Sequence, residues 1–409
     1  MSRQIFLLIV VSILFLLDLY VFQLIKTLTA SLTGTARTLI HVFYWVFNLS
    51  GWLAILSFVI FPRESIHHTT QQLLSTWIGM VYIPKLFGLI FLLLDDFIRL
   101  LTWIYEQIMP AKLSEGNPEK NTIPRSEFLM KAGLVAMTIP VVTTSWGIIS
   151  GAHDYRVRRR TLYLPNLPKA FDGIRLVQIS DVHSGSFYNK TAVSGGIDKI
   201  LGEKPDAIFF TGDLVNNKAV EMKDYQDIFS RLKAPLGVYS VLGNHDYGDY
   251  VTWESAQAKQ RNLQDLIATH RHMGWDILMN EHRFLEVDNE KIAVIGIENW
   301  GAKGRFAKYG DLEKAHQGTE DAPVKILLSH DPSHWDAQIN GSKAEDYMEY
   351  YKASNIQKYA FKDIDLTLSG HTHGMQFGVD SEVFRWSPVK YMYEQWADLH
   401  QHENQYLYV

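Results

Sequence analysis

The stretch IRLVQISDVH, residues 174–183, joins a short, mostly apolar run to an Asp-Val-His motif. The run at 174–179 is rich in branched apolar residues and has the length of a buried strand. Asp181 and His183 follow it directly, at the point where such a strand would end. An aspartate and a histidine at this spacing recur by chance in unrelated loops. The stretch therefore predicts a metal site only if other parts of the chain supply matching residues at matching places.

Four later segments repeat the arrangement of an apolar run followed by polar residues and glycines. The runs are residues 207–210, 238–242, 326–328 and 364–368. The loops after them read TGDLV (211–215), GNHD (243–246), SHDP (329–332) and GHTHG (370–374). Segments typical of helices lie at 191–203, 221–232 and 252–272. This alternation predicts an α/β fold, in which loops at the carboxyl ends of the strands converge on one site.

The side chains in these five loops are carboxylate, amide and imidazole groups. They are Asp181, His183, Asp213, Asn244, His330, His371 and His373. Seven such donors exceed the needs of one ion and suit two divalent cations that share a bridging carboxylate. The chain has no cysteine, which excludes thiolate ligands and disulfides. Mixed ligation of this kind fits manganese, iron or zinc, and does not choose among them.

The other histidines lack a preceding strand, and we interpret them as structural or solvent-exposed. Examples are His67, His68, His270 and His272. The net charge of −5 also argues against nucleic acid as a partner, because nucleic-acid binding requires a basic face. The sequence does not indicate an oligomeric state.

The first third of the chain has a different character. Residues 5–25 carry one charge, Asp18, residues 39–61 carry none, and residues 128–149 carry only Lys131. Each run is long enough for the roughly 20 residues with which a helix crosses a bilayer. Soluble helices rarely stay apolar on every face over this length.

A further apolar segment, residues 73–101, has less certain limits. It is interrupted by Pro84, Lys85, Asp95, Asp96 and Arg99. With this segment included, the sequence predicts an α-helical transmembrane region of about four spans at 1–150. The soluble domain then occupies residues 151–409.

Basic residues in the short loops are the guide to orientation. One side carries Lys26, Arg37, Lys112, Lys120 and Arg125, and the other carries Arg3 and Arg63. This distribution favours a multi-pass protein of the cell membrane with an extracytoplasmic soluble domain. The stretch RVRRR, residues 156–160, argues for the opposite side unless its arginines are surface positions on the first strand of the domain. The stretch RSEFLMK, residues 125–131, fits either an incomplete twin-arginine export signal or the start of a helix.

The series D-x-H, G-D, G-N-H-D, H and G-H-x-H resembles the calcineurin-like metallophosphoesterases. The resemblance covers the chain from about residue 155 to its end. The stretch LPKAFDGIRLVQISDVH, residues 167–183, is similar to the bacterial membrane-associated branch of that family. The resemblance implies an αββα two-sheet sandwich with two metals held at one edge of the sheets.

The resemblance also implies roles for individual residues. One metal would bind Asp181, His183 and His373, and the other would bind Asn244, His330 and His371. Asp213 would bridge the two. His245 would contact the phosphoryl group or protonate the leaving oxygen, with Asp246 orienting its ring. Two cations offset the negative charge of a phosphate ester and lower the pKa of a bound water, so that hydroxide can attack phosphorus.

These observations predict a membrane-anchored dinuclear-metal phosphohydrolase. Its substrate would be a phosphomonoester or, in preference, a phosphodiester or pyrophosphate, belonging to a lipid or to another phosphorylated molecule of the cell envelope. Residues 298–306 (ENWGAKGRF) and 346–352 (DYMEYYK) are candidates for the substrate pocket, although aromatic residues are also common in ordinary loops.

An alternative function belongs to a different class of protein. The chain could be a membrane sensor or a transporter accessory protein with a structural metal site. Asp18, Lys85 and Asp95 would then be the functional residues, because charges inside a membrane are costly.

Overall fold

The chain divides into two compact units, Met1–Asp154 and Tyr155–Val409, in the computed structural model. The structure describes residues 3–61, 66, 68–108, 125–149, 151–303, 306–350, 361–376, 378–380 and 384–409. Arg63, His67, Lys112 and Lys120 lie outside the described residues, as do 304–305 and 351–352 of the two candidate pocket segments.

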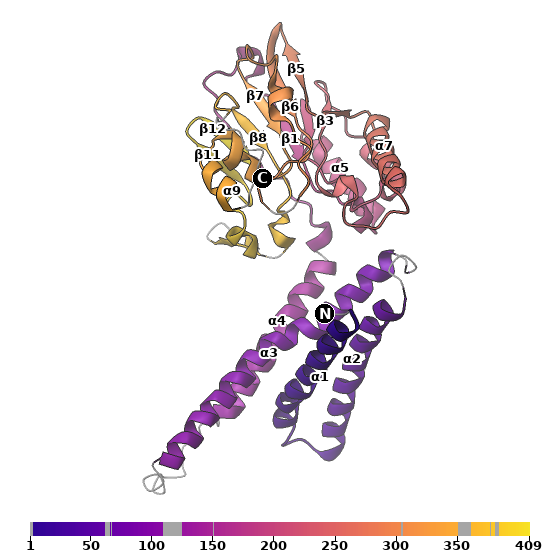
Figure 1. The fold of residues 1–409 in the computed structure, drawn as a ribbon, viewed down its shortest axis with the longest axis vertical. Helices are drawn as coiled ribbons and strands as arrows, with labels where there is room; N and C mark the ends of the chain where they lie inside the picture. Colours follow the sequence, from indigo (N-terminus) through magenta and orange to yellow (C-terminus); the bar gives the residue numbers. More distant parts are fainter. Residues whose placement is uncertain are drawn as a thin grey trace. The chain divides into compact units, whose positions relative to one another are not determined.

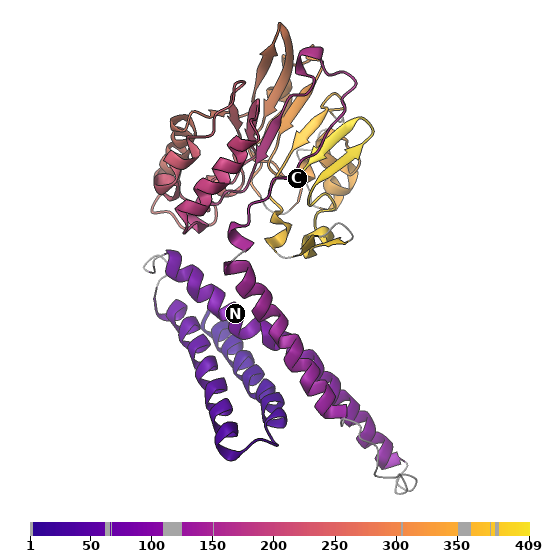
Figure 2. The ribbon, with the colours of Figure 1, turned by 180° about the vertical axis from the view of Figure 1, so that it is seen from behind.

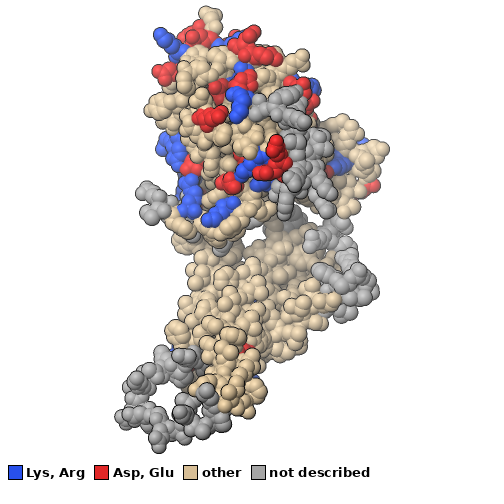
Figure 3. Space-filling model, turned by 60° about the vertical axis from the view of Figure 1, so that its left-hand side comes forward, with Lys and Arg blue, Asp and Glu red and all other residues tan. Residues whose placement is uncertain are grey.

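The first unit consists of long apolar helices. They are α1 (Arg3–Leu28), α2 (Gly34–Ile60), α3 (His68–Ile108) and α4 (Arg125–Ile149). Each contains a segment long and apolar enough to cross a membrane. Large apolar side chains point outward, including Phe43 and Trp146 at 69% and 70% exposed. The face of this unit in Figure 3 is almost free of charged side chains. These features are those of a membrane protein.

Two segments discussed from the sequence lie within these helices. The interrupted segment at 73–101 is part of one helix, α3, which continues through Pro84. Residues 125–131 form the first turns of α4, where Glu127 and Lys131 pair at 2.6 Å.

Charged side chains inside the helical unit have partners. Lys85 Nζ lies 2.5 Å from Asp18 Oδ1 and also donates to Asn48 Oδ1. Trp52 Nε1 donates to the other Asp18 oxygen at 2.9 Å. Asp95 pairs with Arg99 at 2.7 Å. Because Asp18, Asn48 and Lys85 come from different helices, their contacts hold α1, α2 and α3 in register.

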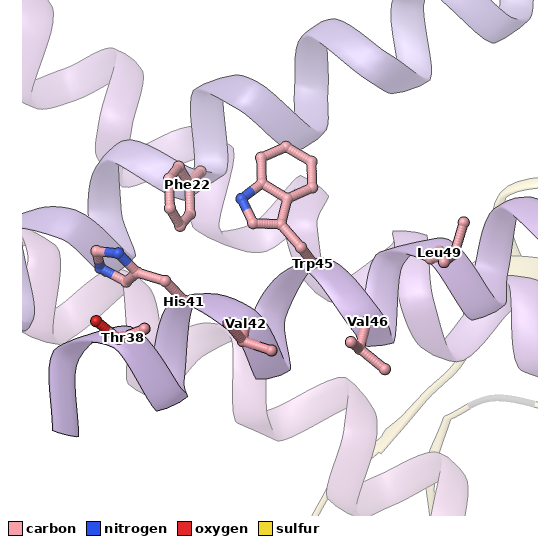
Figure 4. A pocket seen from close by; sticks show the side chains of 7 residues that line it. All are labelled: Phe22, Thr38, His41, Val42, Trp45, Val46 and Leu49. Atoms are coloured by element: carbon pink, nitrogen blue, oxygen red, sulfur yellow. The ribbon is translucent and has the colours of Figure 1, made fainter. Parts of the chain in front are cut away.

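A shallow apolar groove of about 360 Å³ runs along α1 and α2 (Figure 4). Its lining consists of Phe22, Thr38, His41, Val42, Trp45, Val46 and Leu49. The Phe22 ring contacts His41 and Trp45, with centroid distances of 4.9 and 5.3 Å. The polar side chains of the lining, Thr38 and His41, lie together at one end of the groove.

The second unit contains two large sheets. The first is parallel, with the order β1 (Leu176–Ile179), β2 (Ala207–Phe210), β3 (Val238–Ser240) and β4 (Asp276–Ile277). The second has the order β11 (Leu399–His402), β12 (Gln405–Tyr408), β8 (Leu366–Leu368), β7 (Lys325–Leu328), β6 (Glu290–Gly296) and β5 (Glu281–Val287). Its inner four strands are parallel, and β11 and β5 are antiparallel edges. A separate ribbon pairs β9 (Val379–Asp380) with β10 (Arg385–Trp386).

Alternation along the strands builds the core between and outside the sheets. Ala207 and Phe209 of β2 pack in the cluster that includes residues of both sheets, whereas Ile208 and Phe210 pack on the opposite face. That face is covered by α5 (Lys190–Gly202), α6 (Gln226–Phe229) and α7 (Ala256–His272). The six-stranded sheet carries α8 (Leu312–His316) and α9 (Ala344–Tyr350) on its outer face (Figures 1 and 2). The expected αββα sandwich is confirmed.

Two expected elements are wrong. The helix expected at 221–232 is a 3₁₀ segment, Ala219–Asp224, followed by the short α6, because the backbone of Tyr225 is not helical (φ −123°). The arginines at 156–160 lie in a segment without strand pairing. They are nevertheless surface positions: Arg159 pairs with Glu203 and Arg160 with Asp398, both at 2.5 Å.

Candidate metal centre

The five predicted loops converge because their strands are neighbours. The loops after β1, β2 and β3 lie at one edge of the first sheet, and those after β7 and β8 lie at an edge of the second. The Asp181 N–H donates to the Gly212 carbonyl at 2.9 Å, which joins the first two loops. The His371 N–H donates to the Asp181 carboxylate at 3.0 Å, which joins the two sheets. All nine predicted site residues therefore stand in loops that are tied together.

Five of the seven candidate ligands have a left-handed backbone. The φ angles are 54° for Asp181, 45° for His183, 59° for Asp213, 72° for His371 and 50° for His373. Residues with a Cβ rarely adopt this conformation, and such strain is concentrated at functional sites. The motif spacing gave no signal of this strain.

Glycines in the same loops permit the carboxylates to approach the backbone. A Cβ on Gly243 would overlap Asp213 Oδ1, and a Cβ on Gly370 would overlap Asp181 Oδ2. These two positions therefore require glycine for space.

Asp181, His183, Asp213 and His373 form one tight cluster. Each offers a ligand atom, and all four atoms lie within 4.8 Å of one another. His373 Nε2 is 2.9 Å from Asp181 Oδ1, and it is 3.1 Å from His183 Nε2. Two carboxylates and two imidazole nitrogens that converge in this way fit a divalent cation.

A second group continues from the same Asp213 oxygen. Asp213 Oδ2 lies 3.5 Å from His183 Nε2 and 3.2 Å from His330 Nε2. His330 Nδ1 bonds to the Thr211 carbonyl at 2.8 Å, which turns Nε2 toward the site, where this buried atom makes no hydrogen bond to a described residue. Beside it, Asn244 Oδ1 and His371 Nδ1 are 2.8 Å apart. This donor set also fits a divalent cation, and Asp213 stands between the two groups.

The carboxylates of the site attract positive charge. Burial by itself would lower the pKa of His330, but Asp213 and Asp181 more than offset this and raise it to about 10. Burial likewise tends to raise the pKa of Asp213, and nearby His330 lowers it below its ordinary value. The negative charge of these carboxylates would also stabilise a metal cation placed among them.

His245 lies at the edge of the first cluster. Its ring is 4.8 Å from that of His183 and 4.5 Å from that of Tyr250, measured between centroids. Its Nδ1 bonds to the Asn216 carbonyl at 2.8 Å, and its backbone N–H donates to Asp213 Oδ1 at 2.8 Å. Within the described residues, Nε2 has no hydrogen-bond partner and is free to meet a substrate.

The expected pairing of Asp246 with the His245 ring is wrong. The Asp246 carboxylate instead accepts backbone N–H groups of Asp213, Leu214 and Gly243, each at 2.9 Å. It turns away from its neighbour because buried N–H groups of the β2 loop need an acceptor. Asp246 thus positions the loop that carries Asp213, and the Asn216 carbonyl orients His245.

Three residues near the site were not predicted. The Asn244 amide donates to the Tyr250 hydroxyl at 2.7 Å. The Tyr393 hydroxyl lies 3.1 Å from His371 Nε2 and 3.3 Å from Asp331 Oδ2. Asp331 stands in the quoted SHDP loop and could have been included, whereas the two tyrosines follow no motif.

The two candidate pocket segments differ in their contacts with the metal ligands. In residues 298–306, the Phe306 ring packs edge-on against His371 at 5.1 Å, so this segment reaches the site. In residues 346–352, Tyr347 is buried and its ring lies 5.6 Å from Lys303 Nζ.

Sequence comparisons match both units. Residues 2–152 match the family described as "Probable Calcineurin-like phosphoesterase, transmembrane domain", and residues 174–375 match the family described as "Calcineurin-like phosphoesterase". An uncharacterized metallophosphoesterase of Campylobacter jejuni is 24% identical over 83% of this chain and 77% of that protein.

Two further relatives match a smaller share of this chain. A zebrafish (Danio rerio) transmembrane protein with a metallophosphoesterase domain is 26% identical over 59% of this chain and 50% of its own length. A Chlamydia trachomatis protein named as a UDP-2,3-diacylglucosamine pyrophosphatase is 26% identical over 59% of this chain and 76% of its own length. The match thus spans between half and about three quarters of these relatives.

Proposed function

Because the chain belongs to the calcineurin-like phosphoesterases and carries the transmembrane domain found with them, we propose that it is a membrane-anchored dinuclear-metal hydrolase. Its reaction is the cleavage of a phosphodiester or pyrophosphate bond in a lipid or cell-envelope substrate. The Chlamydia relative, named for a pyrophosphatase that acts on a lipid-bearing nucleotide, supports this substrate class.

The observation that carries the proposal is the position of Asp213. One of its oxygens faces His183 of the first group and His330 of the second, at 3.5 and 3.2 Å. Asp213 would bridge two cations, with Asp181, His183 and His373 on one and Asn244, His330 and His371 on the other. Manganese, iron and zinc all suit these ligands.

The cations, when bound, would neutralise phosphoryl oxygens and lower the pKa of a nucleophilic water. The side chains of the chain perform the remaining steps. His245, whose ring lies 4.8 Å from that of His183, would donate a proton from Nε2 to the departing oxygen. Asn216 holds the opposite ring nitrogen, so the proton is presented from a fixed position. Asp246 keeps the β2 loop, and with it Asp213, in place.

Hydrolysis by the full-length chain tests the proposal. In detergent, the chain loaded with Mn²⁺ is expected to hydrolyse bis(4-nitrophenyl) phosphate, to lose activity on chelation and to regain it when Mn²⁺ is restored. Metal content is measured in parallel. A chain that retains two equivalents of metal and hydrolyses neither this ester nor a pyrophosphate diester contradicts the proposal. Lipid profiling of a deletion strain then identifies the substrate that accumulates.

We further propose that the second unit is extracytoplasmic. The basic residues of the short loops support this side, and the pairing of Arg159 and Arg160 with acidic residues accounts for arginines that otherwise suggest the cytoplasm.

The absence of cysteine makes this orientation directly measurable. Lys291→Cys, at an exposed position of β6, is expected to react with a membrane-impermeant maleimide in intact cells. The matched variant Ser31→Cys, on the exposed loop between α1 and α2, is expected to react only after the cells are lysed. The reverse pattern of labelling would place the second unit in the cytoplasm.

A further inference from the structure

Two lysines of the segment that follows β6 are half-buried near the candidate metal centre. Lys303 Nζ lies 4.7 Å from the centroid of the Tyr393 ring and donates to the Met392 carbonyl. Lys308 Nζ lies 4.9 Å from the Trp300 ring. Both ammonium groups therefore rest on aromatic faces.

Neither lysine forms an ion pair with a described residue. No carboxylate of the described residues lies within 4 Å of Nζ of Lys303 or Lys308, whereas nearby Lys343 pairs with Glu394 at 2.7 Å. Burial lowers the pKa of both Lys303 and Lys308. Asp331 attracts both ammonium groups, and Asp336 and Glu394 attract Lys303, from beyond 4 Å. An anionic ligand in direct contact would offset more of the cost of their partial desolvation.

Tyr393 connects Lys303 to the metal ligands. Its ring meets Lys303 on one side, and its hydroxyl lies 3.1 Å from His371 Nε2 on the other. Phe306, between Lys303 and Lys308 in sequence, packs against the same imidazole at 5.1 Å. Lys303 and Phe306 thus border the second group of ligands, and Lys303 is one aromatic side chain away from His371.

We propose that Lys303 and Lys308 bind the second phosphoryl group of a substrate that contains two adjacent phosphoryl groups. The inference rests on the proposed function and narrows it, because a simple phosphodiester has no such second group. The oxygen of water bonds to the first phosphorus, and the bond from that phosphorus to the bridging oxygen breaks. The bridging oxygen leaves with the second phosphoryl group, and the two lysines stabilise the charge that develops there.

Binding of UDP and UMP to the full-length chain tests this proposal, since the two nucleotides differ by one phosphoryl group. The dissociation constants are measured by calorimetry with the Mn²⁺-loaded protein. In the double variant Lys303→Gln, Lys308→Gln, we expect the affinity for UDP to fall about ten- to a hundredfold, as the loss of charge-assisted hydrogen bonds implies. The affinity for UMP should fall by less than about threefold, because the remaining contacts are the same.

Lys390→Gln is the matched control. This lysine also lies over a tyrosine ring, at 5.3 Å from Tyr391, but it is exposed. The control is expected to bind both nucleotides as the unmodified chain does. Metal content and melting temperature of every variant identify general damage to the fold.

Equal losses of UDP and UMP affinity, or no loss of either, would overturn the role of the two lysines. Since binding is measured without turnover, this result is separate from the hydrolysis test. A chain that prefers UDP through these lysines but hydrolyses no ester would contradict the proposed function alone.

Discussion

Asp213→Asn is expected to abolish binding of the second equivalent of metal and to lower hydrolysis by about three orders of magnitude or more, since a metal contributes several kcal/mol to transition-state stabilisation. The physical reason is that one Asp213 oxygen faces both groups of ligands. An amide keeps the shape of the side chain but has no negative charge to offset two cations. Metal content by mass spectrometry and turnover of bis(4-nitrophenyl) phosphate measure the two effects.

Asp224→Asn provides the control for this substitution. Asp224 is exposed and pairs with Lys190 at 3.0 Å, outside the candidate centre. The control should retain both metal and activity. If Asp213→Asn kept two equivalents of metal and full turnover, Asp213 would not be the bridging ligand and the dinuclear arrangement would be wrong.

His245→Ala is expected to reduce turnover by about a hundred- to ten-thousandfold, the usual contribution of a general acid. Metal content should not change, because the His245 ring bonds to a backbone carbonyl and lies beside the ligands. The loss should depend on the leaving group. An alkoxide needs a proton as it departs, whereas 4-nitrophenolate leaves as a stable anion.

The expected signature is therefore a larger loss for an alkyl diester than for bis(4-nitrophenyl) phosphate. His272→Ala, on the exposed end of α7, is the matched control and should be active on both. A loss that is equal for the two esters would argue that His245 binds the phosphoryl group and does not protonate the leaving oxygen.

The sequence predicted the short apolar strands that precede the motif loops. The run at 207–210 coincides with β2, and the run at 326–328 lies within β7, because four or fewer consecutive apolar residues with no polar face are typical of central parallel strands. The hairpin of β5 and β6 was missed. Its turn at Asp288 and Asn289 has φ angles of 48° and 66°, a conformation that such residues favour between strands. The Asp288-Asn289 pair could therefore have indicated this hairpin from the sequence.

Within the candidate centre, the loops could be predicted but the directions of side chains could not. Motif order placed Asp246 next to His245, and the structure turns its carboxylate to the β2 loop instead. Tyr393 reaches His371 from a segment with no metal motif, so only the fold brings them together. Asp and His adopt the left-handed backbone more often than most residues with a Cβ, but the sequence does not show at which positions they do so.

The buried pair of Asp18 and Lys85 has a consequence for biogenesis. Either charge on an isolated helix in lipid costs about 2.5–3.5 kcal/mol at the bilayer centre. Contact between α1 and α3 removes most of that penalty, since each charge then meets its opposite. Insertion of these two helices is therefore energetically coupled, and α1 reaches its most stable state in the bilayer when α3 has arrived beside it.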